Sequence, residues 1–220
     1  MLGAKFRQSL KKLFLSITKP LALLPLTPNQ FTFLAVPLAL IAAYFLYSQK
    51  LSFALAFVIL AVLVDALDGS FAQNKGLKSN FGNYFDAVVD KVVESVFYIG
   101  FAFISPILAI LALAGTMLEG FAKPRVGLVI ITDNHDWPAI GERSDRLLIL
   151  VLGMLAAVIV SQFLLFKYSV FVIEATLLLI FLLTTVGFVQ RVAYARKLIV
   201  KAEKEKTLLP YLLLKAKKRK

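Results

Sequence analysis

The chain has 220 residues, of which 60% are hydrophobic and 17% charged, and its mean hydropathy is +0.82. A water-soluble domain is much less apolar, so the composition predicts an integral membrane protein. The absence of cysteine excludes disulfides and thiolate metal sites. The net charge is +12, but the basic residues lie at the ends of apolar segments, where anionic lipid attracts them. We therefore expect a lipid bilayer as a partner and no nucleic acid.

Residues 1–20 alternate basic and apolar side chains at helical spacing. Their apolar positions are too interrupted for a signal peptide, and the pattern is typical of an amphipathic helix on a membrane surface. We expect a juxtamembrane helix here. The stretch LTPNQFT follows, and its Pro28 in a first turn, with Thr27 or Asn29 as the cap, indicates a helix start.

Six apolar segments follow, each close to the ~20 residues that cross a bilayer as a helix. They cover residues 31–48, 51–72, 83–104, 106–126, 146–166 and 169–191. The predicted fold is therefore an all-α integral membrane protein with six transmembrane helices. We expect one domain over residues 1–220, ending in a basic cytoplasmic tail at 195–220.

The lysines and arginines are distributed unevenly around these segments. Six spans place both termini and the two longer polar loops, 73–80 and 131–146, on one side of the membrane. The other side carries only Lys50 and Lys167, whereas the first side carries the remaining loop and terminal charges. This bias predicts a multi-pass protein of the plasma membrane with both termini in the cytoplasm.

Four aspartates interrupt the second and third apolar segments. Asp65 and Asp68 share a helix face, and Asp86 and Asp90 share a face of the next helix, since i, i+3 and i, i+4 positions are neighbours. A short polar loop joins the two helices as a hairpin, so the acidic faces can meet near the cytoplasmic end. Carboxylates at membrane depth are costly, and four facing each other would repel strongly.

A cation between the carboxylates would remove this repulsion. The ligands are all oxygens and His135 lies in a distant loop, so the hard cations Mg²⁺, Mn²⁺ or Ca²⁺ are favoured over zinc. Four carboxylates suffice for two ions. Small residues at positions 69, 72 and 82 lie in phase with the acids; they indicate either close helix packing or, as we expect, room for a substrate with a diphosphate.

Residues 65–90 resemble the signature of the CDP-alcohol phosphatidyltransferase family, D-x2-D-G-x2-A-R-x8-G-x3-D-x3-D. The chain matches seven of the eight defined positions, and its six-span pattern is similar to the family's over the whole chain. The resemblance implies an enzyme that transfers a phosphatidyl-type group from a CDP-linked lipid to an alcohol and releases CMP. It also implies a homodimer and two divalent ions, Mg²⁺ or Mn²⁺. The departure is Gln73, where the family usually has Arg; Lys75 or Lys78 would replace part of its charge.

Position by position, the resemblance implies three sets of site residues. The metal ligands would be Asp65, Asp68, Asp86 and Asp90, and Asp90 would also be the catalytic general base. The CDP-lipid would contact Asn29, Thr32, Gly69, Ala72, Gln73 and Gly82. The acceptor's phosphate would bind Lys123, Arg143 and Arg191, where three spans deliver cations to the cytoplasmic boundary.

The stretch GERSDR, which contains Arg143, resembles inositol-phosphate-using members of the family, with glycerol 3-phosphate as the rival acceptor. Ordinary positive-inside anchoring would also place these cations here. Two glutamates in the spans have simpler interpretations: Glu119 one turn before Lys123 predicts an intrahelical ion pair, and Glu94 is expected to pair with Lys91 or a hydroxyl.

Three alternatives remain open. A Mg²⁺-dependent membrane prenyltransferase also uses Asp-rich helices, although it needs more spans and two separated Asp motifs. A cation-coupled transporter would use the acids as ion ligands, but it needs a polar route to the far side of the membrane. Gln73 leaves room for an inactive relative.

Overall fold

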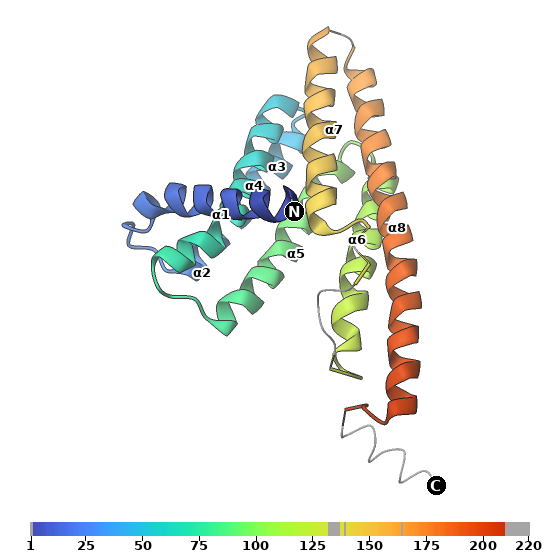
Figure 1. Ribbon diagram of the computed structural model, residues 1–220. Helices are drawn as coiled ribbons and strands as arrows, with labels where there is room; N and C mark the ends of the chain where they lie inside the picture. Colours follow the sequence, from blue (N-terminus) through green and yellow to red (C-terminus); the bar gives the residue numbers. More distant parts are fainter. Residues whose placement is uncertain (1, 132–136, 139, 164, 210–220) are drawn as a thin grey trace.

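The computed structural model describes residues 2–131, 137, 138, 140–163 and 165–209, with side chains from residue 12 onward. Within these ranges the chain is helical and contains no strand (Figure 1), which confirms the all-α prediction. The helices are α1 (Leu2–Leu21), α2 (Pro28–Phe33), α3 (Ala35–Tyr47), α4 (Leu51–Asn74), α5 (Asn80–Ala102), α6 (Pro106–Val126), α7 (Arg143–Phe163) and α8 (Phe166–Glu205).

Five helical segments are long and apolar enough to cross a membrane. They are Pro28–Tyr47, which joins α2 to α3, and the helices α4, α6, α7 and α8. Helix α5 is similar in length, with 23 residues, but it carries four charged side chains. The six-helix prediction is thus matched by length and composition for five helices.

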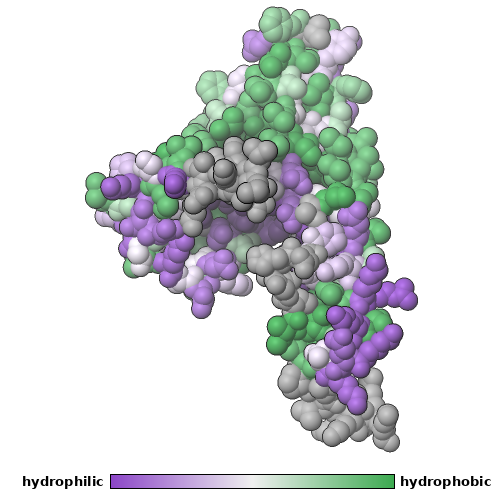
Figure 2. All heavy atoms as spheres, in the orientation of Figure 1, coloured by the Kyte–Doolittle hydropathy of each residue, from purple (hydrophilic) through white to green (hydrophobic). Residues whose placement is uncertain are grey.

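The surface of the bundle is apolar. Ile107, Ile110, Leu152 and Phe171 are all more than half exposed. Figure 2 shows hydrophobic residues over the upper part of one face and hydrophilic residues over the lower part. In a soluble protein such extensive exposed apolar surface would cause association, whereas in a bilayer it is solvated by lipid. The chain is a multi-pass membrane protein.

The stretch LTPNQFT (residues 26–32) contains a helix start, as predicted. Thr27 caps α2: its hydroxyl accepts from the Gln30 backbone N–H at 3.3 Å, and Gln30 Oε1 accepts from the Thr27 backbone N–H at 2.8 Å. This reciprocal capping box satisfies backbone donors that helix formation leaves unpaired. Because Thr27 is the cap, Asn29, the second residue of α2, does not serve as the cap. Helix α1 lies across the bundle, at a steep angle to α7 and α8 (Figure 1).

Helix α8 is longer than its apolar pattern. It has 40 residues, about 60 Å at about 1.5 Å per residue, and continues to Glu205. The predicted boundaries at 191 and 195 therefore mark where apolar sequence ends, and the helix itself continues through the first part of the basic tail. Residues 210–220 of that tail lie outside the described residues.

Small residues set how closely the helices pack. A Cβ at Gly100 of α5 would lie 2.8 Å from Ala43 Cα of α3, and one at Gly153 of α7 would clash with the side chain of Thr176 in α8. Helices α3, α4 and α5 pack together, as do α6, α7 and α8 with α8 in the middle. No Cα of α5 lies within 8 Å of a Cα of α7, so only side chains connect these two helices.

Candidate active site

Three of the four aspartates meet where α4 faces α5. Asp65, Asp86 and Asp90 each contribute a carboxylate oxygen, and these oxygens all lie within 4.8 Å of one another. The hairpin between the helices makes this possible: Gly76 turns the chain with a φ of +68°, and Ser79 caps α5 by accepting from the Gly82 N–H at 2.9 Å. The predicted approach of the two acidic faces is present in the structure.

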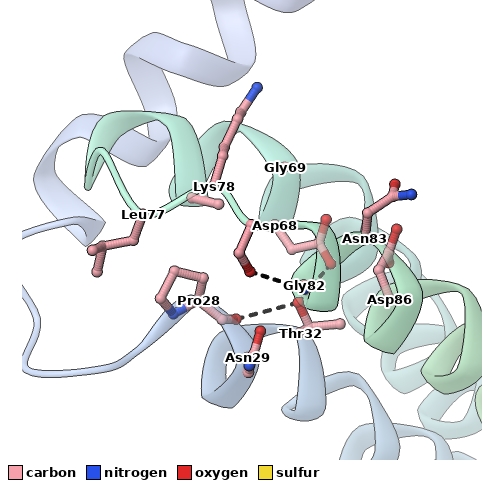
Figure 3. Close-up of a pocket in the computed structure, with 12 residues that line it drawn as sticks. Pro28, Asn29, Thr32, Asp68, Gly69, Leu77, Lys78, Gly82, Asn83 and Asp86 are labelled. Carbon is pink, nitrogen blue, oxygen red and sulfur yellow. Dashed lines mark hydrogen bonds between the residues drawn. The ribbon is translucent and has the colours of Figure 1, made fainter.

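Asp68 is not one of these three acids, but its side chain interacts with Asp86, and it has a further partner in α2. The buried hydroxyl of Thr32 donates a 2.8 Å hydrogen bond to Asp68 Oδ2, shown as a dashed line in Figure 3. Asp68 and Asp86 both line one cavity, so Asp86 belongs to the three-acid group and to the cavity wall. Thr32, predicted to contact the CDP-lipid, thus also positions an acid.

The cavity lies beside the acids and measures about 220 Å³. Its walls come from α2, α4, the hairpin loop and α5 (Figure 3). Five of the six residues predicted to contact the CDP-lipid line it: Asn29, Thr32, Gly69, Ala72 and Gly82. Residues separated widely in sequence therefore share one pocket at the acid cluster.

Gly69 faces open space, and this distinguishes the two interpretations of the small residues, close helix packing and room for a substrate. A Cβ built there would meet nothing within 4 Å, whereas one at Gly82 would lie 3.1 Å from Ser79 Oγ and 3.5 Å from Asn29 Oδ1. Close helix packing explains Gly100, but it does not explain Gly69. The absence of a side chain at Gly69 serves the cavity.

Gln73 is the predicted contact that does not line the cavity. Its Oε1 accepts a 3.1 Å hydrogen bond from Lys78 Nζ. Lys78 is the one cationic residue among those that line the cavity in the described chain, although its side chain extends away from Asp68 (Figure 3). Lys75 instead donates to the Leu24 carbonyl at 2.7 Å.

Arg143 joins the acid cluster from α7. Its NH1 and NH2 donate to the two oxygens of Asp65 at 2.9 and 2.8 Å, and NH1 lies 2.7 Å from Asp90 Oδ2. Arg143 is the first residue of α7 and its side chain is 24% exposed. The residue predicted to bind an acceptor phosphate is therefore in contact with two predicted metal ligands.

The donor set fits a hard divalent cation. The second oxygen of Asp90, Oδ1, is buried and has no hydrogen-bond partner, which is costly for a carboxylate oxygen unless a cation or proton compensates it. Three converging carboxylate oxygens with no nitrogen or sulfur donor are typical ligands of Mg²⁺ or Mn²⁺.

Arg191, also predicted to bind the acceptor, has a buried position nearby. Its NH2 lies 2.6 Å from Glu119 Oε1 and 3.6 Å from Glu142 Oε1, so it reaches the neighbour of Arg143 in sequence. NH1 also donates to the Glu119 carbonyl at 3.1 Å. Lys123 lies in the last turn of α6, one turn beyond Glu119.

Arg146 centres a buried ion-pair network that the sequence did not reveal. Its guanidinium donates to both oxygens of Glu94, at 2.6 and 3.0 Å, and to Glu119 Oε2 at 2.9 Å. Glu119 then pairs with Arg191, and the expected Lys91–Glu94 pair is present at 3.2 Å. The network takes residues from α5, α6, α7 and α8. The signal for it is the presence of opposite charges inside several apolar segments.

Comparisons with known proteins agree with this geometry. A family model described as CDP-alcohol phosphatidyltransferase matches residues 25–170. Archaetidylinositol phosphate synthase of Pyrococcus horikoshii is 30% identical over 201 residues, covering 88% of this chain and 96% of the relative. A bifunctional IPC transferase and DIPP synthase of Rubrobacter xylanophilus is 30% identical over 135 residues, covering 59% of this chain and 31% of the relative.

Solved structures of phosphatidylinositol phosphate synthase from Mycobacterium tuberculosis share the fold. The structure with CDP-DAG bound has a TM-score of 0.67 at 22% identity, covering 84% of this chain and 94% of that chain. The structure in complex with manganese and citrate has a TM-score of 0.66 at 23% identity, covering 83% and 88%.

Proposed function

The chain belongs to the CDP-alcohol phosphatidyltransferase family, and from this premise we propose that it transfers a phosphatidyl-type group from a CDP-linked lipid to inositol phosphate. As a member it is a membrane transferase of phospholipid biosynthesis. In the proposed reaction the acceptor hydroxyl forms a bond to the lipid-side phosphorus, the diphosphate bond breaks, and CMP leaves. The observation that carries the proposal is the contact of Arg143 with the acids beside the cavity.

Two divalent ions, Mg²⁺ or Mn²⁺, would be held by Asp65, Asp68, Asp86 and Asp90. Three of these acids converge and the fourth lines the adjoining cavity. Bound there, the ions would neutralise the diphosphate and polarise the phosphorus. The Mycobacterium tuberculosis enzyme has been solved in complex with manganese, and the all-oxygen donor set of this chain supports a divalent ion at this site.

Asp90 would take the proton of the acceptor hydroxyl. Its Oδ1 is buried and has no hydrogen-bond partner, while its Oδ2 contacts Arg143. A carboxylate oxygen without a donor can accept a proton from a hydroxyl held within hydrogen-bond reach.

The cytidine diphosphate portion of the donor would occupy the cavity. Asn29, Gly69, Ala72 and Gly82 line it beside Asp68 and Asp86, so a nucleotide there would place its diphosphate against the acids. Thr32 would act by holding Asp68. Gln73 would act through Lys78, to which it is hydrogen-bonded.

The acceptor's phosphate would bind Arg143, with Lys123 and Arg191 as further cations. Arg143 touches the acid cluster through Asp65 and Asp90. The relative from Pyrococcus horikoshii is named archaetidylinositol phosphate synthase, and a lipid product that contains inositol phosphate favours inositol phosphate over glycerol 3-phosphate as the acceptor. Because the chain belongs to the CDP-alcohol phosphatidyltransferase family, prenyl transfer and ion transport are no longer the leading alternatives.

The finer topology is also part of the proposal. Helix α5 would be the sixth transmembrane helix, with its acids turned inward, and α1 would lie on the cytoplasmic surface. The positive-inside bias supports cytoplasmic termini and a cytoplasm-facing site. Residues 1–220 would form one domain, and two copies would form a homodimer.

A panel of acceptors tests the function. The purified protein is incubated with a CDP-lipid and inositol phosphate, glycerol 3-phosphate or free inositol, and CMP and the new lipid are measured by mass spectrometry. We expect product from inositol phosphate; product from free inositol alone would overturn the acceptor assignment. Arg143→Ala should raise the KM for inositol phosphate more than that for the CDP-lipid, and the reverse order would contradict its role.

A further inference from the structure

Arg143 contacts two carboxylates that the proposed function assigns to metal. We propose that the Arg143 guanidinium and a divalent cation compete for Asp65 and Asp90, and that this competition couples metal binding to binding of the phosphorylated acceptor. The inference rests on the proposed function, because it takes the acceptor's phosphate as the second ligand of Arg143.

The geometry at Asp65 supports competition between the Arg143 guanidinium and a cation. Both oxygens of Asp65 accept from Arg143, at 2.8 and 2.9 Å. A divalent ion bound to either oxygen would lie close to the guanidinium, and two like charges at such a distance repel strongly in a partly buried site. The same argument applies to Asp90 Oδ2, which lies 2.7 Å from NH1.

Arg143 can leave this position without moving α7. Its side chain is 24% exposed, and its buried Nε has no hydrogen-bond partner. One turn later, Arg146 is fully buried and bound to Glu94 and Glu119. The helix start is therefore fixed by Arg146, while the end of the Arg143 side chain can rotate.

The space beside Arg143 is suited to such a rotation. Arg143 lines a pocket of about 460 Å³ together with Asp65 and Ser144. A cation on Asp65 and Asp90 would release the guanidinium into this pocket, next to the proposed transfer site. There its planar donors can bind a phosphate in place of the carboxylates.

Linkage makes the coupling reciprocal. If metal binding frees Arg143 for phosphate, then phosphate that engages Arg143 removes the competitor of the metal. Each ligand should therefore tighten binding of the other. A purely structural Arg143–Asp65 pair would instead stabilise the metal ligands, and its loss would weaken metal binding.

Direct metal binding tests the proposal without turnover. Binding of Mn²⁺ to the full-length protein in detergent is measured by electron paramagnetic resonance for wild type, Arg143→Gln and Arg125→Gln. Arg125 is exposed and lies over the Phe121 ring, so its variant controls for the loss of one positive charge. Circular dichroism checks that each variant is folded. If Arg143→Gln does not fold, Arg143→Lys, which retains the positive charge, takes its place in the test.

We expect Arg143→Gln to bind Mn²⁺ about fivefold or more tightly than wild type, with Arg125→Gln unchanged. Arg143→Lys, which cannot make the bidentate contact, should bind Mn²⁺ more tightly as well. Inositol phosphate, without CDP-lipid, should tighten Mn²⁺ binding in wild type and leave Arg143→Gln unaffected, after correction for Mn²⁺ bound by inositol phosphate alone.

Equal or weaker Mn²⁺ binding by both Arg143 variants would overturn the competition. Tighter Mn²⁺ binding by the variants, together with no effect of inositol phosphate on wild type, would overturn the coupling. Failure of the proposed acceptor would be seen separately, as absent CMP release with inositol phosphate in the acceptor panel.

Discussion

Arg146 and Glu94 form a buried bidentate ion pair, with nitrogen–oxygen distances of 2.6 and 3.0 Å, that ties α7 to α5. No Cα of one helix lies within 8 Å of a Cα of the other, so this pair connects the two helices through side chains. Arg146 is one turn from Arg143, and Glu94 is one turn from Asp90. The buried pair therefore sets the distance across which Arg143 reaches the acids.

Removing Arg146 should destabilise the protein strongly. Arg146→Leu would leave Glu94 and Glu119 buried with a lost partner, and breaking a buried pair in this way costs about 3–5 kcal/mol. The midpoint of thermal unfolding in detergent should fall well below that of Arg196→Leu, which removes an exposed arginine. An unchanged midpoint for Arg146→Leu would show that the network does not hold the bundle.

Replacing Asp90 should lower the rate of CMP release strongly and the affinity for the CDP-lipid less strongly. Asp90→Asn keeps the size of the side chain but cannot take the acceptor's proton, so CMP release should fall by about 10²-fold or more. Binding of a CDP-lipid, measured by calorimetry, should change less, because Asp90 does not line the cavity and Asp65, Asp68 and Asp86 remain as ligands for the ions. A variant with near wild-type turnover would exclude Asp90 as the base.

Two glycines provide a matched pair. Gly69→Ala adds a methyl group to the cavity without a clash, so it should weaken cytidine nucleotide binding while thermal stability holds or rises, since alanine favours a helix by about 1 kcal/mol. Gly100→Ala would place its Cβ 2.8 Å from Ala43 Cα and should cost about 1–3 kcal/mol of stability. The opposite pattern would mean that Gly69 serves packing.

Lys78 should account for part of the donor's affinity. It is the cation that lines the cavity in the described residues, and attraction to a diphosphate favours it there. Lys78→Ala should raise the Kd for CDP, measured by calorimetry, more than Lys75→Ala, because Lys75 is bound to the Leu24 carbonyl. Equal effects of the two variants would indicate that general charge, and not position, is responsible.

Much of the candidate site could be predicted from helical periodicity. Asp65 precedes Asp68 by three residues and Asp86 precedes Asp90 by four, and a loop short enough to form a hairpin joins the two helices. These local facts suffice to bring acidic faces together, and the structure places Asp65, Asp86 and Asp90 in one group. The spacing could not show that Asp68 would bind Thr32.

Contacts between distant helices could not be predicted in the same way. The partners of Glu119 are Arg146 and Arg191, from two other helices, and only the packing of α6, α7 and α8 brings them within reach. The end of α8 was missed for a different reason: an apolar pattern reports the length embedded in lipid, whereas helix formation continues through residues of good propensity to Glu205.

The dependence of CMP release on a divalent cation tests the central claim most directly. The protein is stripped by exhaustive chelation and then assayed with a CDP-lipid and inositol phosphate, before and after Mg²⁺ or Mn²⁺ is restored. If carboxylates of α4 and α5 hold the ions that act on the diphosphate, release should vanish on chelation, return with either ion, and stay absent in Asp65→Asn with Asp86→Asn. Undiminished release after chelation would contradict the account.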